Sequence, residues 1–273
     1  MLYLGIVVFN SCVENSIILK QNITSNKDVR VIVFDNSTDR NLQNVNRNFI
    51  RDKSDLLYMT NGGNIGLSSA YNKMLDYIKN QDIVNTDNDY VMWIDDDTDV
   101  SSDLIEQVRT GINQGYDIIL PKIEGQDGII YSPNERGRIR NNLVLNRGNK
   151  IDLSKINGIN SCLTVKLSIF NDFEYDESLF LDQVDQFFFD KMRKRNLRYL
   201  IIEHVVKQNF SQRNTIRKQE YLSRFAIRKK DILQYGKISP DSNIFYCRVK
   251  VLLLGIQFAF KSGSIKYLLE AIK

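Results

Sequence analysis

The stretch YVMWIDDD, from Tyr90 to Asp97, runs five strand-forming residues directly into three aspartates. An apolar run of this length is typical of a buried strand in a parallel sheet. Three adjacent carboxylates repel one another unless a cation or hydrogen-bond donors offset their charge. The alternative is an acidic cap for a helix beginning near Ser101, but such a cap requires one acid and not three. We therefore expect this strand to end at a cation site.

The strand at Tyr90 belongs to a longer alternation of strands and helices. Strands are predicted at Leu2–Phe9, Asp28–Phe34, Leu56–Thr60, Tyr90–Ile94 and Ile118–Pro121, and helices at Cys12–Gln21, at Leu67–Lys79 and from a Ser101/Ser102 cap to Gln114. This alternation predicts a mostly parallel, Rossmann-like α/β sheet with helices on both faces. Beyond it we expect loops and a hairpin to about Asn160, a strand entering a helix at Ile159–Phe170, a helix within Leu179–Leu197, and a strand at Tyr199–Ile202.

Polar side chains follow each of the first four predicted strands. They are Asn10, Asp35, Asn61–Asn64 and Asp95–Asp97. Polarity scattered at random over a surface would not coincide with four consecutive strand ends. Because ligands of such sheets bind beyond the carboxyl ends of the strands, the sequence predicts one binding site at this edge.

The residues available to hold a metal are mainly carboxylates. The chain has one histidine, His204, and three widely spaced cysteines, which excludes multi-histidine and Cys-x-x-Cys sites and fits a reducing compartment. Oxygen ligands select hard cations, and Mg²⁺ typically takes one or two carboxylates together with substrate phosphates. We therefore expect Mg²⁺ or Mn²⁺ with a bound diphosphate at Asp95–Asp97, and a buried structural role for His204.

Two further segments carry groups suited to chemistry. Asn64–Asn72 opens a helix after Asn61-Gly62-Gly63, where glycines allow a close backbone approach and a helix N-terminus favours anions. It has neither a Walker A nor a Gly-x-Gly-x-x-Gly pattern, so a simple turn with a cap is an equal alternative. Asp182 and Asp185 share one helix face at i, i+3, and one of them is a candidate general base. The alternative is an ordinary acidic pair at a helix start.

The net charge of +4 conceals two unlike regions. Residues 213–273 carry 13 Lys+Arg and 4 Asp+Glu, a charge of +9, which leaves −5 for residues 1–212. We therefore predict a catalytic domain at 1–212 and a basic helical appendage at 213–273, with an anionic partner such as a membrane surface. Val249–Phe260 is apolar but too short to span a bilayer; it is either an interfacial helix or a core or dimer contact. The N-terminus has no signal-peptide pattern, and no nucleic-acid-binding motif is present.

Together these segments resemble the family 2 glycosyltransferases of the GT-A fold, especially their bacterial rhamnosyltransferase-like branch, over residues 2–210. The matching motifs are Phe9-Asn10, Phe34-Asp35-Asn36-Ser37, the set Asn64, Gly66, Ala70 and Asn72, the metal motif Asp95-Asp96-Asp97, and the acceptor-side segment Tyr175–Asp185. Each motif alone is weak, but five in order at suitable spacing are specific.

The resemblance implies roles for these residues. Phe9 and Asp35 would hold the nucleotide base, Asn64 would position the sugar, and Asp97 with Asp95 would meet the ribose and the metal. The remaining donor-site positions of the motifs are Asn10, Asn36, Gly66, Asn72 and Asp96. Asp182 or Asp185 would take the acceptor proton, which gives single displacement with inversion.

Two departures from the family pattern affect this assignment. Many relatives have an acid immediately before the position of Val184, and here Gln183 stands there, so the choice between Asp182 and Asp185 stays open. Many relatives also have a metal-binding histidine near Asn209, whereas His204 lies five residues earlier. Either Asn209 is a weak metal ligand or the site lacks that ligand.

The resulting prediction is an inverting, metal-dependent glycosyltransferase. The favoured donor is dTDP-rhamnose, with a UDP-hexose or UDP-galactofuranose as the alternative. The acceptor is a hydroxyl of a glycan or lipid-linked glycan in bacterial cell-surface polysaccharide synthesis, and the location is cytoplasmic, at the inner face of the membrane. The alternatives from other classes are a non-catalytic nucleotide-binding module tethered to the membrane and a nucleic-acid binder.

Overall fold

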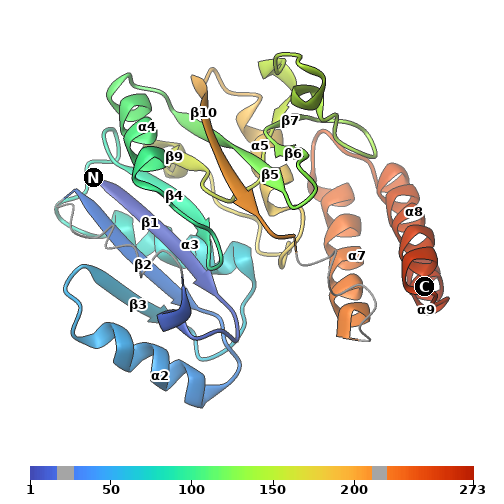
Figure 1. Cartoon of the computed structure of the whole chain (residues 1–273), viewed down its shortest axis with the longest axis horizontal. Helices are drawn as coiled ribbons and strands as arrows, with labels where there is room; N and C mark the ends of the chain where they lie inside the picture. The colour runs from blue at the N-terminus through green and yellow to red at the C-terminus, as the bar shows by residue number, and fades with distance from the viewer. Residues whose placement is uncertain (17–27, 211–219) are drawn as a thin grey trace.

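The computed structural model describes residues 1–16, 28–210 and 220–273, and its centre is one mixed sheet (Figure 1). The strands run in the order β10-β5-β9-β4-β1-β2-β3, and β6 pairs with β5 outside this path. Their bounds are β1 Leu2–Val8, β2 Val29–Asp35, β3 Leu56–Thr60, β4 Tyr90–Asp95, β5 Ile118–Gly125, β6 Ile130–Ser132, β9 Thr164–Lys166 and β10 Tyr199–Gln208. The architecture is a mostly parallel α/β sheet flanked by helices, which confirms the predicted fold class.

Strand β6 pairs antiparallel with β5, and along the main path of the sheet strand β9 is the exception to the parallel pattern. It lies between β4 and β5 and pairs antiparallel with both. Its three residues give no periodicity of their own, and the sequence pattern predicts only a strand somewhere in Ile159–Phe170. A separate two-stranded antiparallel sheet, β7 (Asn134–Glu135) with β8 (Ile156–Asn157), lies in the segment that was expected to form loops and a hairpin.

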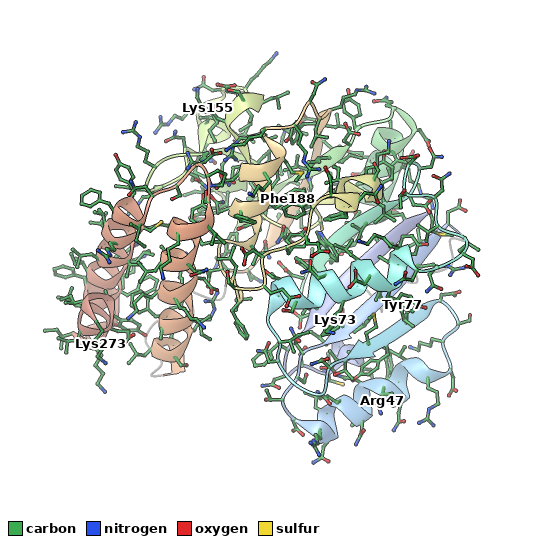
Figure 2. All side chains as sticks on the ribbon, turned by 180° about the vertical axis from the view of Figure 1, so that it is seen from behind. Arg47, Lys73, Tyr77, Lys155, Phe188 and Lys273 are labelled. Atoms are coloured by element: carbon green, nitrogen blue, oxygen red, sulfur yellow. The ribbon has the colours of Figure 1, made fainter. Side chains whose placement is uncertain are left out.

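Helices cover both faces of the sheet. One core contains side chains from α3 (Leu67–Lys79) and α5 (Val184–Met192), and a second contains side chains from α2 (Arg40–Arg51) and α4 (Ser102–Asn113). Figure 2 shows Phe188 of α5 inside the molecule, whereas Lys73 of α3 and Arg47 of α2 lie on its surface. At the centre, the Trp93 ring stacks on Tyr71 with 4.0 Å between centroids.

Two helix predictions differ from the structure. Helix α2 is not expected from the sequence because its buried residues include the amides Gln43 and Asn46, which carry no apolar periodicity. The predicted helix at Cys12–Gln21 is a short 3₁₀ turn, η1 (Val13–Asn15), in its described part, and its residues 17–21 lie outside the described ranges. Further 3₁₀ turns are η3 (Val144–Arg147), η4 (Leu153–Lys155) and η5 (Leu167–Asn171).

Three helices form the described part of the C-terminal region, residues 220–273: α7 (Glu220–Ile238), α8 (Ile244–Ser262) and α9 (Lys266–Ile272). They pack around an aromatic cluster of Tyr221, Phe225, Phe258 and Tyr267. In Figure 1, α7 lies between the sheet-bearing part and α8, and α8 with α9 forms the end of the molecule opposite β3. Within the described ranges, no helix combines the length and apolarity needed to cross a membrane.

Candidate functional site

The carboxyl ends of β1, β2 and β4 meet at one edge of the sheet. The parallel register pairs Val8 with Asp35 and Val7 with Asp95, so the two aspartates flank the end of β1. The segment after β1 contacts both neighbours. The backbone N–H of Asn10 donates to Ser37 Oγ at 2.9 Å, and the Ser11 hydroxyl donates to Asp96 at 2.7 Å. The strand ends therefore form one polar edge, as a parallel sheet requires.

Asp35 is completely buried and fully hydrogen-bonded. Its carboxylate accepts from Asn46 Nδ2 at 2.8 Å, from the Tyr58 hydroxyl at 2.9 Å and from the backbone N–H of Ser37 at 2.9 Å. Asp35 thus joins α2 and β3 to the strand ends, while Phe9 presents a ring that is 52% exposed at the same edge. The contact of these two residues with a nucleotide base stays a prediction.

The loop before α3 is shaped by Asn36 and by one glycine. Asn36 donates from Nδ2 to the Gly66 carbonyl at 3.0 Å and accepts from the Ile65 N–H at 3.2 Å. The side chain of Asn64 accepts from the Gly66 N–H at 3.0 Å. Gly66 has φ +86°, and a Cβ there would lie 2.7 Å from the Phe180 carbonyl oxygen. A side chain is excluded at this position, because it would strain the backbone and displace the Phe180 segment.

The three aspartates at the end of β4 form no ion pair with any residue of the described ranges. Burial raises the pKa of Asp95 to about 6, and the neighbouring charge of Asp97 adds to this effect. Burial and the charge of Asp96 also raise the pKa of Asp97. Opposing this, Gln208 and Ser161 donate hydrogen bonds to Asp95. A cation at this point would relieve the repulsion that raises both pKa values.

Gln208 at the end of β10 is the additional polar group at this cluster. Its Nε2 donates to Asp95, and its Oε1 is buried without a hydrogen-bond partner in the described part of the chain. Gln208 and Asn209 together occupy the position at which many relatives have a metal-binding histidine, and the sequence alone assigned the ligand to Asn209 because the strand was expected to end at Ile202. The strand instead continues past an irregularity between Ile201 and Val205 to reach Gly125. An amide oxygen left unpaired in a buried site is costly and is well suited to a cation.

Among the described residues, neither His204 nor Asn209 forms a hydrogen bond with Asp95 or Asp97. His204 contacts the start of α4, with Nδ1 2.5 Å from Asp103 and Nε2 3.3 Å from Ser101 Oγ, which agrees with a structural role. Asn209 follows β10 and is exposed. Within residues 1–16, 28–210 and 220–273, no group of three or more His, Cys, Asp or Glu side chains is placed to hold a metal. The donor set at Asp95 and Asp97 is thus two carboxylates and an amide oxygen, which suits a cation that is also held by phosphates.

Asp182 and Asp185 lie in different environments. Asp182 forms an ion pair with Arg224 of α7, and Arg228 Nε lies 3.7 Å from its other oxygen. Asp185, in the first turn of α5, accepts from the Gln186 N–H at 2.7 Å and has no ion pair among the described residues. Burial raises the pKa of Asp185 to about 6, and the charge of Asp182 adds to it. Asp182 is therefore neutralised by a partner, whereas Asp185 is a carboxylate poised to accept a proton.

The charges of both acidic clusters act on the hydroxyl group of Tyr71. Burial raises the pKa of Tyr71, and the charges of both Asp95 and Asp185 raise it further. Asn160 contacts the same hydroxyl. The charges of two carboxylates from distant motifs therefore both act on this one phenol. The structure does not bring Asn72 into this site. It exchanges hydrogen bonds of 2.9 and 3.0 Å with the backbone of Tyr175.

The comparisons with known proteins agree with this geometry. The model of the family described as "Glycosyl transferase family 2" matches residues 8–178. No curated protein sequence matches the chain.

Three solved structures show the similarity of fold. The crystal structure of S. aureus TarS 1-349 has a TM-score of 0.50 at 17% identity, over 96% of this chain and 73% of that one. The mannosyltransferase PcManGT from Pyrobaculum calidifontis, in complex with GDP-Man and Mn²⁺, has a TM-score of 0.59 at 12% identity, over 99% and 85%. GalNAc-T7 with UDP, GalNAc and Mn²⁺ has a TM-score of 0.58 at 12% identity, over 99% and 56%. At these identities the likeness concerns the fold alone.

Proposed function

This chain belongs to glycosyl transferase family 2, and from that membership and the site geometry we propose that it transfers a sugar from a nucleoside-diphosphate sugar to a hydroxyl group, with inversion and with a divalent cation. The observation that carries the proposal is that the aspartates ending β4 and Asp185 all lack an ion pair among the described residues, while the charges of Asp95 and Asp185 both act on Tyr71. The first suits a metal-bound diphosphate and the second suits a base.

Asp95, Asp97 and the amide oxygen of Gln208 would hold Mg²⁺ or Mn²⁺. The unpartnered Oε1 of Gln208 supports this fit, and it favours Gln208 over the exposed Asn209 as the ligand from the end of β10. When bound, the cation would offset the charge on the departing diphosphate. The presence of Mn²⁺ in the similar folds of PcManGT and GalNAc-T7 is consistent with this assignment.

Asp185 would accept the proton of the acceptor hydroxyl, so that the oxygen attacks the anomeric carbon from the face opposite the diphosphate. Its raised pKa suits proton transfer near neutral pH. Asp182 is a weaker candidate for the base because its carboxylate is already engaged by Arg224 and Arg228. Single displacement inverts the anomeric centre and requires no covalent enzyme intermediate.

For the donor, we propose dTDP-rhamnose first, then a UDP-hexose or UDP-galactofuranose. Phe9, Asp35 and Asn64 remain the proposed contacts to the base and the sugar, with Asn10, Asn36, Gly66 and Asp96 as the supporting donor-site residues. The exposed ring of Phe9 at the strand ends supports a stacking role. Similar folds are known in complex with UDP-GlcNAc and GDP-Man.

For the acceptor, we propose a glycan or lipid-linked glycan at the inner face of the membrane, in bacterial cell-surface polysaccharide synthesis. Among the described residues, seven of the fourteen exposed large apolar side chains lie between Phe245 and Ile272. Exposed Arg248, Lys261 and Lys266 accompany them, which suits an anionic interface. A homodimer contact through the same surface is the competing explanation.

The experiment that tests the function is a thermal-shift screen of dTDP-, UDP- and GDP-sugars, each with and without Mn²⁺. We expect one nucleotide class to raise Tm only with the metal, and Asp97→Asn to abolish that rise. Asp103→Asn, which removes an exposed carboxylate at α4, is the matched control and should behave like wild type. Metal-independent binding without any transfer would favour a non-catalytic nucleotide-binding module, and an absence of nucleotide binding would overturn the proposal.

A further inference from the structure

The segment that leads into Asp185 is held by a carboxylate from α7. Asp231 is completely buried, and it accepts the backbone N–H groups of Phe180 at 3.0 Å, Leu181 at 2.8 Å and Asp182 at 2.8 Å. These three N–H groups lie outside helices and strands, so they have no partner within regular secondary structure. One side chain therefore satisfies three consecutive backbone donors next to the candidate base.

The same segment is also hydrogen-bonded to the start of α3, on the side of the site proposed for the nucleotide sugar. The Leu67 N–H donates to the Phe180 carbonyl at 2.6 Å, and the Ser68 hydroxyl donates to the Leu179 carbonyl at 2.7 Å. Both donors belong to the first turn of α3, directly after Gly66. The segment is thus fixed between α3 on one side and α7 on the other.

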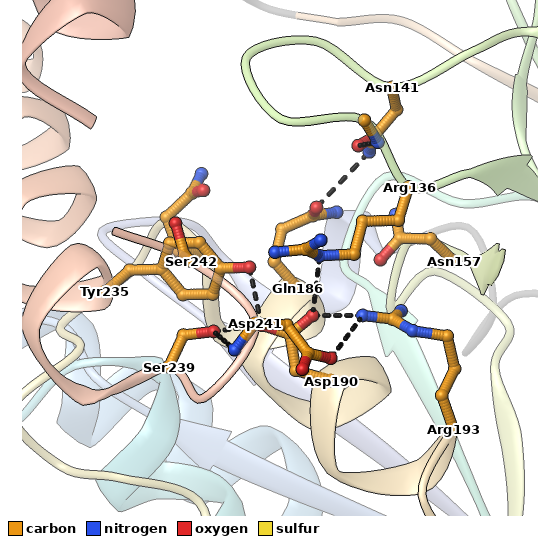
Figure 3. Close-up of polar contacts among 12 residues, drawn as sticks. Arg136, Asn141, Asn157, Gln186, Asp190, Arg193, Tyr235, Ser239, Asp241 and Ser242 are labelled. Carbon is orange, nitrogen blue, oxygen red and sulfur yellow. Dashed lines mark hydrogen bonds and ion pairs between the residues drawn. The ribbon is translucent and has the colours of Figure 1, made fainter. Parts of the chain in front are cut away.

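A second buried carboxylate connects α5 to the end of α7 (Figure 3). Asp190 of α5 is 1% exposed and accepts from the Tyr235 hydroxyl at 2.5 Å and from the Ser239 hydroxyl. Arg193 pairs with the same carboxylate, and Arg136 Nε lies 3.3 Å from it. Since Asp185 lies in the first turn of α5, the helix that carries the candidate base is attached to α7 both before its start and beyond its middle.

We propose that Asp231 is a positioning residue for the transfer reaction, which holds Phe180–Asp182 so that Asp185 faces the acceptor hydroxyl. The proposal rests on the function inferred above for Asp185. It makes α7 a part of the active site, although α7 lies in the basic region that the charge pattern divides from residues 1–212. Asp231 touches no reacting atom, and its effect on the reaction passes through the backbone of the segment.

The test replaces the carboxylate by a group of the same shape. In Asp231→Asn, the amide nitrogen faces backbone donors and at least one N–H loses its acceptor. We expect kcat for transfer to fall about 10- to 100-fold, since a displacement of about 1 Å has effects of this size. The affinity for the nucleotide, measured by calorimetry, and the KM for the donor should stay within about twofold of wild type, because the strand ends are untouched. Asp231→Glu, which keeps both acceptor oxygens, should recover part of kcat.

Hydrogen–deuterium exchange provides a readout that does not depend on the reaction. We expect the amides of Phe180, Leu181 and Asp182 to exchange at least about tenfold faster in Asp231→Asn, with β1 and β4 unchanged. Glu270→Gln is the matched control: it removes a carboxylate that joins α9 to Lys229 of α7 at 2.9 Å and does not contact the segment. It should change neither kcat nor exchange at Phe180–Asp182.

If the amides of Phe180–Asp182 exchanged at the wild-type rate in Asp231→Asn, Asp231 would not hold this segment, whatever reaction the enzyme catalyses. Equal falls in kcat for Asp231→Asn and Glu270→Gln would also overturn the proposal, because the effect would then be general destabilisation. Faster exchange with an unchanged kcat would overturn the positioning role. A wild-type protein without transferase activity would contradict the proposed function alone, and the exchange data would still decide whether Asp231 holds the segment.

Discussion

Two aspartates of this molecule, Asp95 and Asp185, have pKa values raised to about 6 by burial, yet their surroundings differ. Asp95 lies beside Asp96 and Asp97, and amide and hydroxyl groups are its hydrogen-bond partners. Asp185 lies beside Asp182, whose charge is paired with Arg224, and Lys250 of α8 opposes its raised pKa. The carboxylates around Asp95 repel one another, and a bound cation would reduce that repulsion. Around Asp185, the neighbouring acid Asp182 already has an arginine partner. The same raised pKa therefore fits a metal ligand at Asp95 and a proton acceptor at Asp185.

The largest expected effect separates Asp185 from Asp182. Asp185→Asn should lower kcat for transfer by about 10²- to 10⁴-fold, because it removes the proton acceptor. Asp182→Asn should lower kcat by roughly tenfold or less, because it breaks an ion pair that only supports the segment. Steady-state transfer assays on both variants measure the difference. A larger loss in Asp182→Asn than in Asp185→Asn would reverse the assignment of the base.

The next effect concerns the cation side of the comparison. Gln208→Leu should weaken Mn²⁺ binding about tenfold or more, since it removes the unpartnered oxygen and a hydrogen bond to Asp95. Asn209→Ala, the neighbouring exposed amide, is the control and should leave the metal affinity unchanged. Calorimetric titration of Mn²⁺ in the presence of a nucleoside diphosphate measures both. If only Asn209→Ala weakened Mn²⁺ binding, Asn209 and not Gln208 would be the metal ligand.

The pH dependence tests the state of Asp185. As a base it must be ionised, so kcat should fall about tenfold for each unit below pH 6. The raised pKa means that the folded state holds this proton more tightly than the unfolded state does. The contribution of Asp185 to stability is thus present below the unfolded pKa and is lost as pH rises through about 6. Activity and Tm profiles from pH 5 to 8, with Asp185→Asn as the control for Tm, measure the two trends. A kcat that is flat across pH 6 would contradict the role of Asp185.

The smallest effect is expected at the outer surface of the C-terminal helices. Phe260 is 86% exposed, so Phe260→Ser should change Tm little, while it lowers binding to vesicles containing anionic lipid by a few-fold. Val45→Ser, an exposed apolar position on α2, is the matched control. Vesicle co-sedimentation measures binding, and sedimentation velocity measures self-association. If the Phe260 variant altered only the oligomeric state, the surface would be a contact between copies of the chain.

The shared edge of the strand ends was predicted better than the contacts that β10, α2 and α7 make at the site, for a reason that particular residues make clear. Asp35 and Asp95 follow apolar strands directly, so local patterning and the direction of parallel strands bring them to one edge. Gln208 was missed because a strand irregularity hid the length of β10, and Asn46 was missed because α2 buries amides. Asp231 carries no local signal, since an acid in a basic helix resembles a surface residue.

By itself, the sequence determined the positions of strands β1 to β5 along the chain, the start of α3 and the acidic cluster at the end of β4, because these depend on periodicity over a few residues. Only the tertiary structure decided that β9 enters the sheet antiparallel, that Gln208 rather than His204 reaches Asp95, and that Arg224 pairs with Asp182 while Asp185 has no ion pair among the described residues. These outcomes depend on which groups lose their water and which partners face them after folding, and such contacts join residues about 40 to more than 100 positions apart.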